Sequence, residues 1–159
     1  MQKSAIKFLV VLTGCGEKPV TESVINRHHI KNLEVGDLVK LRDISNGNWD
    51  YVCLLTPYSG SVKDYGNKWK EIIDSKIPEL NLNTLNTERW YLLFANNGTV
   101  VANSGLKEFI RFKNFSPVIT RRLNEISLEP EYCVVFDRAA IYKTKFMSSE
   151  FIIFGEIQE

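Results

Sequence analysis

The chain has 159 residues, of which 44% are hydrophobic and 25% are charged, and its net charge is +1. This length and composition are typical of one folded domain with its own core. The near-neutral charge argues against nucleic acid as a partner, and no apolar run approaches the ~18 residues of a membrane-spanning helix.

The first residues have the layout of an export signal. Lys3 and Lys7 form a basic start, and residues 8–12 are an apolar run that leads to a small residue. This order is typical of a secretory signal, so we expect a signal peptide over residues 1–14. The alternative is a buried N-terminal strand over residues 5–12 that ends in a glycine turn.

The end of that signal, Leu12-Thr13-Gly14-Cys15, resembles the lipobox of bacterial lipoproteins. In that family the cysteine thiol is acylated and the peptide before it is removed. The resemblance implies that Cys15 is the lipidated first residue and that the chain is anchored to a membrane surface without crossing it. Gly16 stands where lipoproteins of the inner membrane carry Asp, which implies the periplasmic face of the outer membrane.

Loss of the signal would remove two lysines and leave 18 basic against 19 acidic side chains. We expect residues 15–20 to be a tether and residues 21–159 to be a single periplasmic domain. If Cys15 carries the lipid, Cys53 and Cys133 remain as a pair, and an oxidising periplasm favours a disulfide between them. The alternative is two buried free thiols in neighbouring strands.

In the first half of the domain, Thr21 can cap a helix over residues 22–31. Strands are predicted over residues 38–41 and 49–56, with a turn at residues 46–48 between them, so we expect these two strands to form a hairpin. A further helix is predicted over residues 69–77.

In the second half, residues 90–94 and 99–101 flank Asn-Asn-Gly, which is the strongest hairpin signal of the chain. Ser116 and a following proline begin a helix with Ile119, Leu123 and Ile126 on one face. Strands are predicted over residues 109–112, 132–136, 141–146 and 151–157. The predicted fold is α+β: a mostly antiparallel sheet with two to three short helices in a single domain.

Residues suited to catalysis are few. His28 and His29 are the only histidines, and adjacent side chains on a helix point about 100° apart, so they cannot grip one metal ion together. The chain has no Gly-x-Ser-x-Gly nucleophile motif and no phosphate-binding glycine loop. We therefore expect no catalytic residues, no metal site and no cofactor.

Aromatic side chains gather around one glycine- and proline-containing region. They are Trp49, Tyr51, Tyr58, Tyr65 and Trp69. Large amphipathic rings on a rigid sheet suit protein recognition, so these five are weak candidates for partner contacts. The alternative is that they cover the sheet and pack the loop.

Residues 49–58 (Trp-Asp-x-x-Cys leading to Pro-Tyr) resemble a segment of small uncharacterised lipoproteins of Gram-negative bacteria. Those chains continue with a hairpin like that of residues 92–101 and a Phe-x-Arg-x-Ala pattern, here residues 136–140. The resemblance covers residues 48–145, and no activity is attached to that group. The position of Cys133 near the last motif is compatible with a structural disulfide.

Three hypotheses for function follow. The first is a lipid-anchored, non-enzymatic module that binds another protein, with a role in immunity against a toxin delivered into the periplasm or in exclusion of a second phage. The second is a housekeeping envelope component that binds a lipid or cell-wall ligand. The third is a hydrolase assembled from distant residues, which the scarcity of histidines and nucleophile motifs disfavours.

Overall fold

The computed structural model describes residues 21–22, 24–25, 27–55, 90–106, 110 and 115–159. The described helices are α1 (Arg27–Lys31), α2 (Leu41–Ile44) and α4 (Pro117–Glu125). The strands are β1 (Thr21–Glu22), β2 (Leu38–Lys40), β3 (Tyr51–Leu55), β4 (Trp90–Asn96), β5 (Thr99–Leu106), β6 (Leu128–Pro130), β7 (Cys133–Val135), β8 (Ala139–Phe146) and β9 (Ser149–Ile157).

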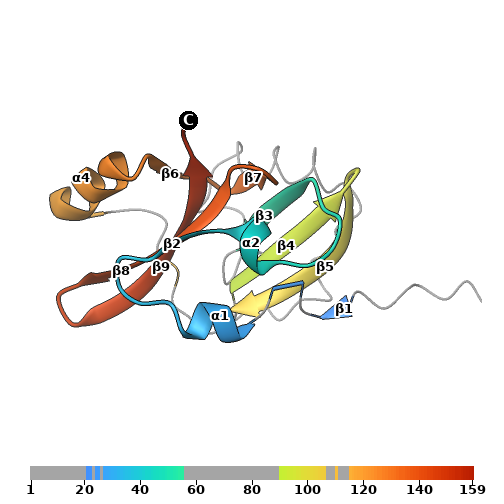
Figure 1. The fold of residues 1–159 in the computed structure, drawn as a ribbon, viewed down its shortest axis with the longest axis horizontal. Helices are drawn as coiled ribbons and strands as arrows, with labels where there is room; N and C mark the ends of the chain where they lie inside the picture. The colour runs from blue at the N-terminus through green and yellow to red at the C-terminus, as the bar shows by residue number, and fades with distance from the viewer. Residues whose placement is uncertain (1–20, 23, 26, 56–89, 107–109, 111–114) are drawn as a thin grey trace, which may run out of the picture.

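The strands form two sheets, which lie side by side in Figure 1. One sheet has five strands in the order β1-β5-β4-β3-β7, and the other has four in the order β2-β8-β9-β6. All strand pairs are antiparallel except β1 with β5. The predicted α+β class with a mostly antiparallel sheet and short helices is confirmed.

The central hairpin of the five-stranded sheet is the one that the sequence predicts. β4 and β5 pair up to Asn96 opposite Thr99, and the turn between them is Asn97-Gly98. Both turn residues have positive φ, 49° and 79°, as a two-residue turn that matches the strand twist requires. Local turn chemistry therefore determines this register.

The predicted hairpin of the first two strands is wrong. β2 pairs with β8, about a hundred residues later, and β3 pairs with β4 and β7. The chain turns between β2 and β3 through α2, whose Leu41 is fully buried in the core. Burial of Leu41 thus separates the two strands into different sheets.

The predicted helix over residues 22–31 is also wrong in its first half. Thr21 does not cap a helix; it lies in β1, opposite Ala102 of β5. Ile25 is buried and forms a bridge with Ser45, and only α1 is helical. Long-range pairing with β5 replaces the first helical turns, because the apolar stripe there is too weak to hold a helix.

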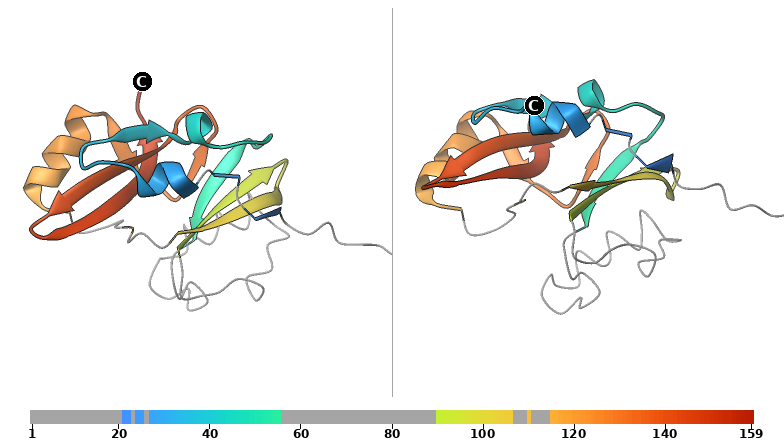
Figure 2. Two further views of the ribbon diagram at one scale, coloured as in Figure 1. Left: turned by 60° about the horizontal axis from the view of Figure 1, so that its bottom comes forward. Right: turned by 90° about the horizontal axis from the view of Figure 1, so that it is seen from below.

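The helix expected after Ser116 is confirmed as α4. The Ser116 hydroxyl accepts a hydrogen bond from the Ile119 N–H (3.4 Å), and Pro117 begins the helix. Ile119 and Leu123 belong to a buried cluster with residues of β8 and β9. In both views of Figure 2, α4 lies beside the four-stranded sheet. The predicted helix over residues 69–77 lies outside the described residues. Of the strand over residues 109–112, only Ile110 is described, and it bridges Ile152.

The core follows the two-residue period of the strands. Val52, Leu54, Leu92 and Phe94 face a cluster that both sheets share, with Ile141, Ile152 and Phe154 contributed by the four-stranded sheet. The intervening Cys53, Leu55, Leu93 and Ala95 form a second cluster on the opposite face of the five-stranded sheet. Tyr142, Phe151 and Ile153 form a third beneath α4. The two sheets therefore belong to one folded unit.

Gly155 of β9 lies against the backbone of β6, and this close approach gives a first prediction. A Cβ at Gly155 would collide with the Glu129 carbonyl oxygen and come within 3.0 Å of the Pro130 Cα. We expect Gly155→Ala to lower the free energy of unfolding in urea by about 2–3 kcal/mol. The control is Gly105→Ala, whose new Cβ would meet only the Tyr91 ring, at 3.2 Å, and should change stability by less than about 1 kcal/mol. Equal stabilities of the two variants would contradict the close packing of β6 on β9.

Candidate functional site

Trp49, the first of the predicted partner-binding aromatics, belongs to the core. Its side chain is only 4% exposed and packs edge-on against Phe94 and Phe136, with ring centroids 5.1 and 4.6 Å apart. Its indole N–H donates a hydrogen bond to the Ser45 hydroxyl, 3.1 Å away. The structure therefore corrects the prediction for this residue, because the buried ring is unavailable to a partner.

The remaining aromatics divide into two groups. Tyr51 is half-buried and packs against the cluster around Cys53, on the face of the sheet opposite Trp49. Tyr58, Tyr65 and Trp69 lie outside the described residues. The structure thus does not bring Trp49 and Tyr51 together on one surface.

Cys53 and Cys133 form a disulfide. They lie directly opposite each other in β3 and β7, with their Cα atoms 4.1 Å apart. The Leu54 N–H donates to the Tyr132 carbonyl oxygen (2.7 Å), so Leu54 and Tyr132 are a hydrogen-bonded pair. The neighbouring pair, Cys53 and Cys133, is therefore a non-hydrogen-bonded pair. Non-hydrogen-bonded pairs are the closer ones in antiparallel sheets, and this register positions the two thiols for the bond.

The two histidines are adjacent residues of α1. His28 and His29 are both exposed on α1, and the His28 Nε2 lies 2.9 Å from the Asn32 Nδ2. Within the described part of the chain, no group of three or more His, Cys, Asp or Glu side chains could hold a metal ion. The described residues therefore supply no candidate metal centre.

Arg122 on α4 is held in its charged form by its neighbours. A hydrogen bond with Tyr142, and then one with Glu125, raise the pKa of the Arg122 guanidinium above its ordinary value. Arg122 Nη1 also lies 3.1 Å from Glu125 Oε2 in an exposed ion pair on α4. Arg122 therefore remains cationic and is already paired.

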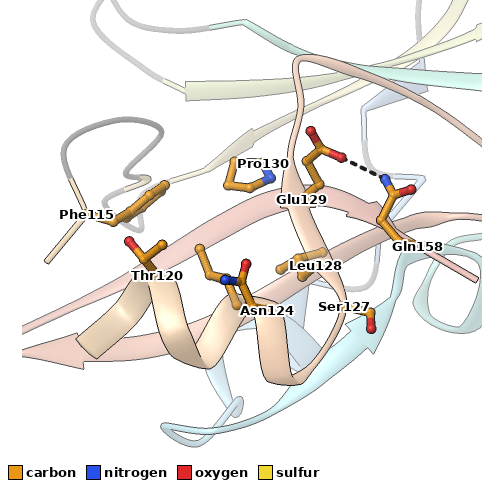
Figure 3. A pocket seen from close by; sticks show the side chains of 9 residues that line it. Phe115, Thr120, Asn124, Ser127, Leu128, Glu129, Pro130 and Gln158 are labelled. Atoms are coloured by element: carbon orange, nitrogen blue, oxygen red, sulfur yellow. Dashed lines mark hydrogen bonds between the residues drawn. The ribbon is translucent and has the colours of Figure 1, made fainter. Parts of the chain in front are cut away.

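A groove of about 440 Å³ runs between α4 and β6 and is the best candidate for a binding surface. Figure 3 shows the nine residues that line it: Phe115, Thr120, Leu123, Asn124, Ser127, Leu128, Glu129, Pro130 and Gln158. At its mouth the Gln158 side-chain amide donates to Glu129 Oε2, 3.0 Å away. The lining mixes apolar side chains with polar ones and contains no histidine or cysteine.

Sequence reasoning missed this groove because it missed β6. Residues 128–130 are too short for an alternating pattern, and their strand character comes from pairing with Ile157, Glu156 and Gly155 of β9. The available signal is Pro130, since proline is confined to edge strands and strand ends.

Comparisons with known proteins identify no relative: no family model, no curated protein and no solved structure matches the chain. Within the ranges that the structure describes, no helix has the length and apolar character needed to cross a membrane.

The disulfide gives a second prediction. It closes a loop with a sequence separation of 80, so its reduction should lower the free energy of unfolding by about 4.5 kcal/mol in the chain-entropy model. Urea unfolding with and without a reductant measures this difference. The double variant Cys53→Ala/Cys133→Ala is the control, and its unfolding should not respond to the reductant. A wild-type protein that is equally stable in both conditions would contradict the prediction.

Proposed function

We propose that this chain is an exported lipoprotein of the Gram-negative outer membrane, that its domain faces the periplasm, and that it binds another protein without catalysing a reaction. The observation that carries this proposal is the disulfide between Cys53 and Cys133. It uses two of the three cysteines and leaves Cys15, at the end of the lipobox-like segment, as the remaining thiol.

The compartment follows from the redox chemistry. Disulfides persist in oxidising environments such as the bacterial periplasm and are rare in the cytosol. A bond between a fully buried cysteine and a half-buried one, in adjacent strands, is typical of a structural cross-link. The bond thus supports export, which is also what the N-terminal signal layout predicts.

The mode of attachment follows from the position of Cys15. Three acyl chains on one residue provide enough buried CH₂ groups for stable anchoring. Five residues separate Cys15 from Thr21 of β1, so the link from lipid to domain spans at most about 20 Å when fully extended. The domain is therefore expected to stay close to the membrane.

A binding role is supported by the groove between α4 and β6. Its mixed apolar and polar lining resembles the composition of interface surfaces, in which an apolar centre is surrounded by a polar rim. Immunity against a periplasmic toxin and exclusion of a second phage both require a tethered binding surface and no chemistry. These are the roles that we propose first.

Intact mass and membrane partition of the expressed full-length protein test the anchor. We expect the wild-type chain in the membrane fraction, beginning at Cys15 and heavier by three acyl groups. The Cys15→Ser variant should be soluble or unprocessed, because serine cannot accept the thioether-linked lipid. Cys53→Ala is the matched control: it removes a cysteine but should leave lipidation intact. A wild-type chain that begins at Met1, is unmodified and remains in the cytosol would overturn the proposal.

A further inference from the structure

We propose that the groove between α4 and β6 receives an extended segment of a partner protein, which lies along the outer edge of β6 and places a basic side chain against Glu129. This inference rests on the proposed protein-binding function and names the surface and the chemistry of the partner. Four observations lead to it.

The first observation is that β6 lies at the outer edge of its sheet among the described strands. β6 is an outer strand of the four-stranded sheet, so among the described strands only β9 pairs with it. The Gln158 N–H donates to the Ser127 carbonyl oxygen (2.8 Å), and Leu128 is opposite Ile157 in the register. By the alternation of an antiparallel ladder, the Leu128 N–H and C=O point away from β9. These groups can accept an added strand, as sheet edges do in peptide recognition.

The second observation is the shape of the space beside that edge. Phe115 and Thr120 lie on one side of β6 and Gln158 on the other in Figure 3. The groove volume of about 440 Å³ is within the range of ligand-binding clefts, about 300–1,000 Å³. Pro130 lacks an N–H, so it limits pairing at its end of the edge and restricts the added segment to a few residues.

The third observation is the charge of Glu129. Two neighbouring carboxylates are neutralised: Glu125 pairs with Arg122 at 3.1 Å and Glu156 with Arg138 at 2.8 Å. Glu129 is exposed and forms no ion pair within the described part of the chain; its Oε2 accepts only the hydrogen bond from the Gln158 amide. A lysine or arginine of the partner complements this remaining charge.

The fourth observation is the position of the groove in the molecule. α4 lies at one end of the domain and β1 at the other, in Figure 1 and in both views of Figure 2. β1 is the described element nearest in sequence to Cys15. In the anchored protein the groove would therefore lie far from the point of attachment and remain accessible to periplasmic proteins.

The test uses the full-length protein in detergent and a phage-displayed library of random heptapeptides as the probe. We expect the selected peptides to be rich in β-branched residues and to carry at least one lysine or arginine.

Asn124→Trp places a large ring in the groove and should weaken their binding by about tenfold or more. Arg121→Trp is the matched control, because Arg121 is also exposed on α4 but does not line the groove. This variant should bind the selected peptides with the affinity of the wild type.

A charge reversal tests the role of Glu129 separately. Glu129→Lys should select peptides with aspartate or glutamate in place of the basic residue, and urea unfolding checks that each variant is folded. No enrichment on the wild type, or peptides that bind Asn124→Trp as tightly as the wild type, would overturn the inference. A concentration-dependent dimer abolished by Asn124→Trp would assign the groove to a second copy and would overturn it as well. None of these results depends on lipidation, so failure of the groove and failure of the anchor are distinguishable.

Discussion

The bond between Cys53 and Cys133 joins β7 to β3 within the five-stranded sheet. The chain passes from β6 in the four-stranded sheet to β7 in the five-stranded sheet and back to β8. β7 has three residues, and among the described strands it pairs only with β3, so few hydrogen bonds between described strands hold this segment in place. The disulfide makes this attachment covalent, and it thereby holds the segment between β6 and β8 on the five-stranded sheet.

The core is arranged around the same crossing. The Trp49 ring contacts Phe94 of the five-stranded sheet and Phe136, which immediately follows β7. The Phe136 N–H donates to the Asp50 carbonyl oxygen (2.9 Å), so backbone and side chains fix the position of one short segment. A fold with a disulfide at this junction is most stable in an oxidising compartment. The proposed location in the periplasm therefore requires the two cysteines to be bonded in the native protein.

The sequence predicts the elements whose signals are local. The Asn97-Gly98 turn determines the β4–β5 hairpin, and Ser116 with Pro117 determines the start of α4. It fails where distant segments decide the structure. Thr21 is a reasonable helix cap by local rules, but pairing with Ala102 places it in a strand. β2 was expected beside β3, although its partner is β8.

The same distinction applies to the candidate site. The cysteine pair could be predicted because its parity and apolar surroundings are visible in the sequence. The groove could not, because β6 exists only through its pairing with β9 and because its walls combine residues 115–130 with the distant Gln158. Trp49 shows the reverse error: an aromatic residue that suits an interface by composition is buried by contacts that no local pattern reveals.

The most direct test of this account is a peptide map of the protein isolated from its native host, alkylated under denaturing conditions without reduction. The account predicts that the peptides containing Cys53 and Cys133 are recovered joined to each other and free of alkylation. Separate, alkylated peptides at both positions would contradict the covalent link between β3 and β7, and with it the main support for export.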